Sequence, residues 1–419
     1  MSSWFSPSQV VVPGLPEHFH FLDLDCKPSS EEAAHFQAVR AVFQLDEDVF
    51  KADAEELLLK VVTDSQKSTA KSGCLMAFHN GLMAKSMTEE EASTLMVILG
   101  AYLEHVQQPE NAPGGDLRCG SLLPRFLGAY VRAQQGWDLG GLLGQRACFF
   151  VTESVFAGVP EDVLGSMEKF DLKGSADDRA QRKPGGELMC WDLLRRDQKF
   201  VPCDADRGAA LLEQLERDTA FLLAQHTPTG PLGLIDYDML PESYRGAPGL
   251  MDYSLLVGVA PCGTSGGSAR LDVTEQRMLP VQAQDKENEQ ATAVELDADE
   301  RLQVQETART LLVGIIDILQ FWTPKKRLAR RFKKFMHMER DDDNEYNGKM
   351  LDTVRPEHYR PRFLAFMREA FSAGSWAESL PRLYGVKGEG VFVQRLASQL
   401  PGPQRRRLSE LSEPGEEPR

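Results

Sequence analysis

The sequence lacks several features that would assign it to a common class of protein. Its seven cysteines are scattered and form no C-x-x-C pair, so no disulfide framework is indicated. The first residues contain no charged segment followed by an apolar one, which predicts no signal peptide. The longest apolar run, residues 311–322, is too short to span a bilayer and contains Asp317. We therefore expect a cytoplasmic protein with reduced thiols, whose membrane contact is peripheral.

Positive charge is also in short supply. The chain has 47 Lys and Arg residues against 63 Asp and Glu residues, a formal net charge of −16. A nucleic-acid backbone would be repelled by this balance, so no nucleic-acid partner is expected. An apolar content of 42% and a charged content of 26% are ordinary for a globular protein. With 419 residues the chain is long enough to bury a large core, arranged in two lobes or domains.

Two apolar stretches each contain a single acidic residue. Residues 250–259 read LMDYSLLVGV around Asp252, and residues 314–320 read GIIDILQ around Asp317. An ionised carboxylate in a buried run is costly unless it is paired or holds a metal. Residues 170–175, FDLKGS, add Lys173 beside a glycine. Taken singly, each stretch favours an ordinary strand end, whereas together they suit a site for a nucleotide and a metal ion.

In this order, FDLKGS, MDYSLL and GIIDILQ closely resemble the motifs of the phosphatidylinositol phosphate kinase family, and the resemblance spans most of residues 17–395. It implies an α+β fold of two lobes, each an antiparallel sheet with packed helices. The expected order is an extended lead-in over 1–30, an N-terminal lobe over 31–153 and a C-terminal lobe over 154–400. Composition predicts a disordered acidic insertion at 262–306 and a disordered tail at 401–419.

The expected nucleotide site begins in the N-terminal lobe. Residues 71–85, KSGCLMAFHNGLMAK, read as a hairpin because Asn80-Gly81 is a favoured two-residue turn. Lys85 ends its second strand, and by itself it would be a lysine that reaches the surface. The resemblance instead implies that Lys85 contacts the phosphates of ATP. Ser72 and Gly73 would let backbone amides approach the same phosphates.

The resemblance assigns the remaining chemistry to the C-terminal lobe. It implies that Asp252 and Lys173 serve the catalytic loop and that Asp317 binds Mg²⁺, so ATP and Mg²⁺ are the expected cofactors. Family members usually have a glutamate eight residues after the nucleotide lysine, where this chain has Ser93. An ion pair shifted to one of the glutamates at 89–91 is the alternative.

Other departures from the family pattern weaken the expectation of catalysis. Asp177 and Asp178 follow FDLKGS, and three aspartates stand at 341–343, where they would repel a phosphorylated head group. An insertion over 226–249 precedes MDYSLL, and Ala260 replaces a histidine that is usual in the family.

Residues 323–340, TPKKRLARRFKKFMHMER, reverse the overall charge. Thr323 and Pro324 are typical of a helix start, and the apolar side chains fall on one face. The segment suits either a solvated helix packed by that face or a helix lying on an anionic membrane. Its predicted membrane-binding residues, the basic cluster, are Lys325, Lys326, Arg327, Arg330, Arg331, Lys333 and Lys334.

An earlier helix is the expected partner surface. SSEEAAHFQAVRAVF places Phe36, Val39 and Phe43 on one stripe and resembles a helix that helps to form the family's dimer surface. An ordinary core helix explains the same pattern. The favoured hypothesis is a weakly active or inactive scaffold that pairs with active type I phosphatidylinositol 4-phosphate 5-kinases at membranes. The alternatives are an active ATP-dependent phosphatidylinositol 4-phosphate 5-kinase and a plain adaptor for anionic lipid.

Overall fold

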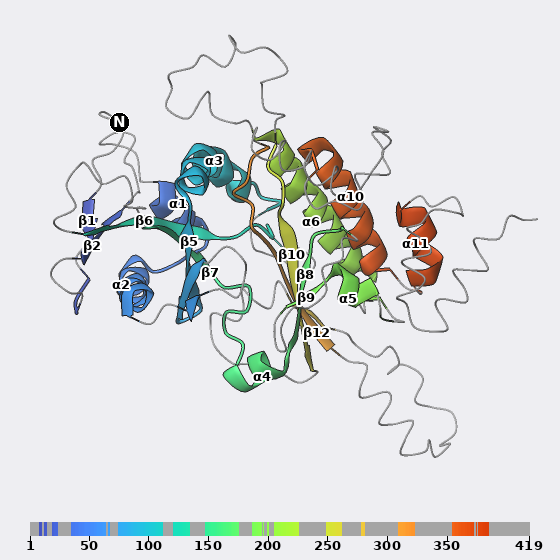
Figure 1. Ribbon diagram of the computed structural model, residues 1–419, viewed down its shortest axis with the longest axis horizontal. Coiled ribbons are helices and arrows are strands. Elements are labelled where there is room, and N and C mark those ends of the chain that lie inside the picture. The colour runs from blue at the N-terminus through green and yellow to red at the C-terminus, as the bar shows by residue number, and fades with distance from the viewer. Residues whose placement is uncertain are drawn as a thin grey trace, which may run out of the picture.

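The computed structural model places two sheets side by side, each with its own helices (Figure 1). The first sheet is seven-stranded, in the order β1-β2-β6-β7-β5-β4-β3. The residues that the structure describes are 8–10, 12–14, 19–23, 35–63, 66–67, 74–111, 120–134, 147–175, 187–194, 196, 199–200, 205–225, 249–261, 278–280, 309–322, 354–372, 374 and 376–384.

The first lobe combines an antiparallel sheet with three helices. Its strands are β1 (Ser8–Val10), β2 (Phe19–Asp23), β3 (Gln66–Lys67), β4 (Leu75–His79), β5 (Leu82–Met87), β6 (Phe126–Gln134) and β7 (Ala147–Glu153). Its helices are α1 (His35–Val42), α2 (Glu47–Thr63) and α3 (Glu89–Gln107).

The second lobe contains a five-stranded sheet in the order β11-β12-β10-β8-β9, in which only the β8–β9 pair is parallel. Its strands are β8 (Glu168–Leu172), β9 (Leu188–Met189), β10 (Ser254–Pro261), β11 (Met278–Pro280) and β12 (Arg309–Ile316). Helices α6 (Ala205–Ala224) and α10 (Pro356–Ala370) lie side by side against it (Figure 1), with α5 (Cys190–Leu194) and α11 (Trp376–Tyr384) nearby. Helix α4 (Glu161–Ser166) lies away from these helices and contacts β10. The predicted two-lobed α+β fold is confirmed, with a mixed second sheet in place of an antiparallel one.

Local sequence rules explain the element that carries Lys85. Asn80 and Gly81 both have positive φ, 45° and 77°, which is the backbone of the tight turn expected between β4 and β5. Helix α3 follows at once, because the Thr88 side chain accepts from the Glu91 amide while the Glu91 carboxylate accepts from the Thr88 amide. Strand β5 and helix α3 are therefore fixed to each other by a single short connection.

Three sequence expectations change in the structure. The lead-in supplies β1 and β2, and β2 is hydrogen-bonded to β6, so part of it belongs to the first sheet. Within the expected disordered insertion, β11 pairs with β12. The apolar stripe of α1 is core: Phe36 and Val39 are fully buried and Phe43 is 7% exposed. Packing within this one chain satisfies that stripe, so it offers no dimer surface.

Several predicted features lie outside the described residues. They are Ser72, Gly73, Asp177, Asp178, most of the insertion at 226–249, the basic cluster, the aspartates at 341–343 and the tail at 401–419.

Candidate functional site

Three strand ends meet at one edge of the second sheet. Strand β10 is antiparallel to both of its neighbours, with Leu255 opposite Leu172 of β8 and Ser254 opposite Ile316 of β12. The carboxyl ends of β8 and β12 and the start of β10 therefore lie together. This register explains why FDLKGS, MDYSLL and GIIDILQ, far apart in the sequence, supply Lys173, Asp252 and Asp317 to one place.

Lys85 reaches this edge from the first lobe. It extends from β5, and its Nζ donates a hydrogen bond to Asp317 Oδ1 across the lobes. The two side chains are 28% and 33% exposed. Burial lowers the pKa of Lys85, but the Asp317 carboxylate more than offsets burial and raises it overall. Burial likewise raises the pKa of Asp317, but the charges of Lys85 and Lys173 lower it overall. Both groups are thus held in their charged forms.

Lys173 and Asp252 form a second pair at the same edge. Lys173 Nζ donates to the backbone oxygen of Asp252 at 2.5 Å and lies 3.6 Å from its Oδ1. Asp252 and Asp317 both have positive φ, 70° and 61°. Non-glycine residues seldom adopt this conformation, and it concentrates at functional sites. The two backbones are also joined, because Met251 N donates to Gln320 O at 2.9 Å.

Two features beneath Lys173 fix its backbone. The thiol of Cys190 accepts a hydrogen bond from the Lys173 amide at 3.2 Å, and the amides of Gly174 and Ser175 also face the sulfur. Burial raises the pKa of this thiol to about 12, so it serves as a neutral acceptor. Gly174 has φ +68°, and a Cβ there would lie 2.9 Å from the Cα of Phe363 in α10. The turn therefore requires glycine.

We expect Gly174→Ala to lower the free energy of unfolding by about 1–3 kcal/mol, because it adds both backbone strain and a clash with α10. Urea unfolding measures this. Gly165→Ala is the matched control, since a Cβ at Gly165 in α4 meets nothing within 4 Å and its φ is not positive. An equal loss in both variants would contradict the argument.

Asp171 is a site residue that the sequence reasoning missed. It precedes Lys173 by two positions, so both point to the same side of the chain where β8 ends. Burial raises the pKa of Asp171, against the opposing effects of Lys173 and the neighbouring Ser254. It therefore accepts a proton more readily than an exposed aspartate. The spacing of two residues between Asp171 and Lys173 in FDLKGS could have indicated that both lie on the same side of the chain.

Residues 89–91 and 93 of α3 are the positions at which a glutamate partner of Lys85 was considered. Ser93 is exposed on α3, on the same side as the exposed Val97, so a glutamate at that position would point away from the site. Glu91 lies one helical turn before the fully buried Leu95 and contributes to the raised pKa of Lys85. The Glu91 carboxylate is engaged by the amide and hydroxyl of Thr88, and the ion pair of Lys85 is with Asp317.

A half-buried apolar surface adjoins Lys85. Met76 lies opposite Lys85 in the β4–β5 ladder, and Phe150 lies opposite it in the β5–β7 ladder. Residues directly opposite share a face of the sheet, as does Met83 two positions before Lys85. All three of these apolar side chains are partly exposed. Their position beside a cation suits the flat, apolar base of a nucleotide.

Within the described residues, no group of three or more His, Cys, Asp or Glu side chains is placed to hold a metal ion. Asp252 and Asp317 are two carboxylates, the number with which Mg²⁺ is commonly held together with phosphate oxygens. Across the same ranges, no helix combines the length and apolar character needed to cross a bilayer.

A family model and several curated proteins match most of this sequence. A model of the family described as "Phosphatidylinositol-4-phosphate 5-Kinase" matches residues 58–240 and 247–370, which include Lys85, Lys173, Asp252 and Asp317. Phosphatidylinositol 5-phosphate 4-kinase type-2 gamma of Xenopus tropicalis is 24% identical over 378 residues, covering 85% of this chain and 77% of that protein. The type-2 alpha enzyme of Mus musculus is 24% identical over 381 residues, covering 84% and 78%. Phosphatidylinositol 4-phosphate 5-kinase 1 of Arabidopsis thaliana is 23% identical over 382 residues, covering 79% and 44%.

Proposed function

This chain belongs to the phosphatidylinositol phosphate kinase family and so to phosphoinositide metabolism, and from that premise we propose that it binds Mg-ATP weakly and acts mainly as a scaffold. In this proposal it binds active type I phosphatidylinositol 4-phosphate 5-kinases and localises them at membranes. Its own lipid kinase turnover is low or absent.

One observation carries the nucleotide part of the proposal: the Lys85–Asp317 and Lys173–Asp252 pairs stand together where the lobes meet. The two lysines would contact phosphate oxygens, and the two carboxylates would hold Mg²⁺. Bound there, Mg-ATP would supply the phosphoryl group for transfer, and its metal ion would neutralise part of the negative charge of the phosphates. The Lys85 side of the sheet adds the apolar wall of Met76, Met83 and Phe150 for the base.

The same pairs support weak binding. Lys85 and Asp317 each satisfy the charge of the other directly, so a ligand must replace a hydrogen bond between charged groups before it gains its own. The Asp177–Asp178 and 341–343 carboxylates add negative charge to the segments expected near ATP and the lipid head group. Because phosphoryl transfer depends on positioning and electrostatics, these changes would reduce turnover by large factors.

A second candidate function is an active ATP-dependent phosphatidylinositol 4-phosphate 5-kinase. The presence of Lys85, Asp252 and Asp317 at one edge of the second sheet favours it, because these are the residues to which the family resemblance assigns ATP, catalysis and Mg²⁺. Turnover separates the two candidates. The pairing surface of the scaffold must lie away from the buried stripe of α1.

We expect wild-type protein to show a small thermal shift at millimolar Mg-ATP and Asp317→Asn to show none. Asparagine loses the carboxylate charge needed for both Lys85 and Mg²⁺. Asp162→Asn makes the same chemical change on the exposed surface of α4 and should respond like wild type. The same preparations are then assayed with radiolabelled ATP and several phosphoinositides. No wild-type shift would refute nucleotide binding, and turnover equal to that of a type I enzyme would refute the scaffold role.

A further inference from the structure

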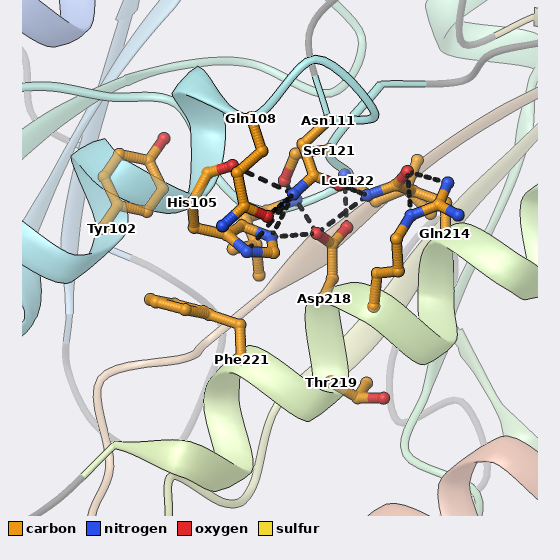
Figure 2. A network of polar contacts seen from close by, with 12 residues as sticks. Tyr102, His105, Gln108, Asn111, Ser121, Leu122, Gln214, Asp218, Thr219 and Phe221 are labelled. Atoms are coloured by element: carbon orange, nitrogen blue, oxygen red, sulfur yellow. Dashed lines mark hydrogen bonds and ion pairs between the residues drawn. The ribbon is translucent and has the colours of Figure 1, made fainter.

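A buried carboxylate joins the two lobes behind the nucleotide site. Asp218 of α6 is 0% exposed and accepts four hydrogen bonds (Figure 2). Its Oδ1 accepts from His105 Nε2 at 2.8 Å, from Ser121 Oγ at 3.0 Å and from Gln214 Nε2 at 3.0 Å. Its Oδ2 accepts from the backbone amide of Leu122 at 2.6 Å. Because a buried carboxylate is costly without partners, this one is held by a full set of donors.

The network contains serine, histidine and aspartate, but its geometry is not that of a hydrolytic site. Ser121 and His105 both donate to the carboxylate, whereas a nucleophilic serine would donate to the histidine. The imidazole ring stacks on Phe221 with ring centroids 4.6 Å apart, and its Nδ1 faces the Asn111 amide at 3.3 Å. The polar side chains around Asp218 are buried, so we assign the network a positioning role; they are His105, Asn111, Ser121 and Gln214.

A short hydrogen-bonded path runs from Asp218 to the site. The Leu122 amide donates to Asp218, and the Leu122 carbonyl accepts from the Ile315 amide at 2.7 Å. Ile315 is in β12, two residues before Asp317. The backbone of one residue, Leu122, thus links α6 to β12, the strand that leads to Asp317.

A second path leads from Asp218 to Lys85. His105 lies in the last turn of α3, and its hydrogen bond ties that end of the helix to α6. The other end of α3 carries the Thr88–Glu91 capping box, directly after the strand that bears Lys85. Helix α3 is a rigid element, so fixing one end restrains the other. The positions of both Lys85 and Asp317 therefore depend on hydrogen bonds to the same carboxylate, that of Asp218.

From these contacts we infer that Asp218 is a positioning residue that sets the distance between Lys85 and Asp317, and so the geometry of the nucleotide site. The inference about geometry rests on the hydrogen bonds alone. Its consequence for Mg-ATP rests on the proposed function.

Asp218→Asn tests this with a nearly isosteric change. An asparagine side chain has one oxygen and one NH₂ group, so it cannot accept at both ends. With its oxygen toward His105, Ser121 and Gln214, the NH₂ group faces the Leu122 amide, donor against donor. Gln214→Met is the matched control, because it removes a buried donor to Oδ1 from the same helix and leaves the Leu122 bond intact.

The direct readout is hydrogen exchange in the absence of nucleotide. Asp218→Asn should raise the exchange rate of the Leu122 and Ile315 amides by about tenfold or more, the factor expected when a hydrogen bond to a charged group is lost. Gln214→Met should leave the rate of Ile315 within a factor of about 3 of wild type. Equal rates at Ile315 in the two variants would overturn the inference. If Asp218→Asn does not fold, native-state exchange of wild type decides: Leu122 and Ile315 should open together with α6, and separate opening refutes the link.

The nucleotide readout separates this inference from the function on which it builds. If the Mg-ATP thermal shift of wild type is absent while Ile315 exchange rises in Asp218→Asn, the positioning role stands and the proposed function fails. If wild type responds to Mg-ATP, Asp218→Asn should require about tenfold more Mg-ATP for the same shift, and Gln214→Met should not. An unchanged requirement in Asp218→Asn would refute the link to the site.

Discussion

Replacing Lys85 by alanine should abolish the response to Mg-ATP and also lower the free energy of unfolding by about 1–2 kcal/mol at neutral pH. The loss arises because Asp317 is left partly buried without its closest cation. Removing one partner of a fully buried pair costs about 3–5 kcal/mol. Both side chains here are about a third exposed, and Lys173 still acts on Asp317, so a smaller loss is expected.

The pH dependence of this loss follows from the direction of the two pKa shifts. The pKa of Asp317 is lowered from 3.8 by folding, so its contribution to stability is present above that value and is lost as pH falls through the folded pKa. The pKa of Lys85 is raised from 10.5, so its contribution is present below that value and is lost as pH rises through the folded pKa. The difference in stability between wild type and Lys85→Ala should therefore be steady between these limits and shrink in acid below 3.8.

Urea unfolding from neutral pH to the acid limit of reversible folding measures this difference. Lys85→Met is the matched control, because methionine keeps much of the apolar stem that lysine packs against the sheet and removes only the charge. If the loss comes from the charge, both variants should show the same pH dependence. A loss in Lys85→Ala that is independent of pH and absent from Lys85→Met would assign the effect to packing and contradict the ion-pair argument.

The parts of the site that could be predicted from the sequence are those defined by short-range rules. Asn80-Gly81 predicted the β4–β5 turn because that dipeptide tolerates positive φ at both positions. Asp252 and Asp317 were found because a lone carboxylate in an apolar run is an unusual and costly pattern. Their convergence at one edge depends on strand register, which the family resemblance supplied and the β8–β10–β12 pairing explains.

What could not be predicted depends on which way a side chain faces and on contacts between distant segments. That Ser93 is exposed depends on the orientation of α3 about its axis, and only packing of Leu95 and its neighbours fixes that orientation. The Asp218 network joins α3, Leu122 and α6 across about a hundred residues, and no local pattern marks it. The α1 stripe shows the converse: a core helix and a dimer helix have the same periodicity, and burial alone separates them.

The second large effect concerns attachment to membranes through the basic cluster. A chain with a net charge of −16 should be repelled by an anionic leaflet unless a local group of cations reverses the field. Residues 325–334 concentrate seven Lys and Arg residues in ten positions, each adding on the order of 1 kcal/mol near such a surface. The neighbouring Leu328, Phe332 and Phe335 provide apolar side chains for insertion into the membrane.

Charge reversal at Lys325, Lys326, Arg330 and Lys333 should therefore release the protein from vesicles that contain phosphatidylserine or phosphoinositides. A matched control reverses Arg405, Arg406, Arg407 and Lys387, which makes the same change in net charge elsewhere in the sequence and should leave binding largely intact. Co-sedimentation measures the binding of both variants.

The salt dependence of binding is a second test of the same attachment. Electrostatic attraction is screened over roughly 8 Å at physiological ionic strength, so wild-type binding should fall steeply with salt, whereas a purely apolar attachment would persist. Deleting the aspartates at 341–343 should tighten binding because they oppose the same field. If the cluster variant still sediments with anionic vesicles at moderate salt, the cluster is not the anchor, and another part of the chain must bind the vesicles.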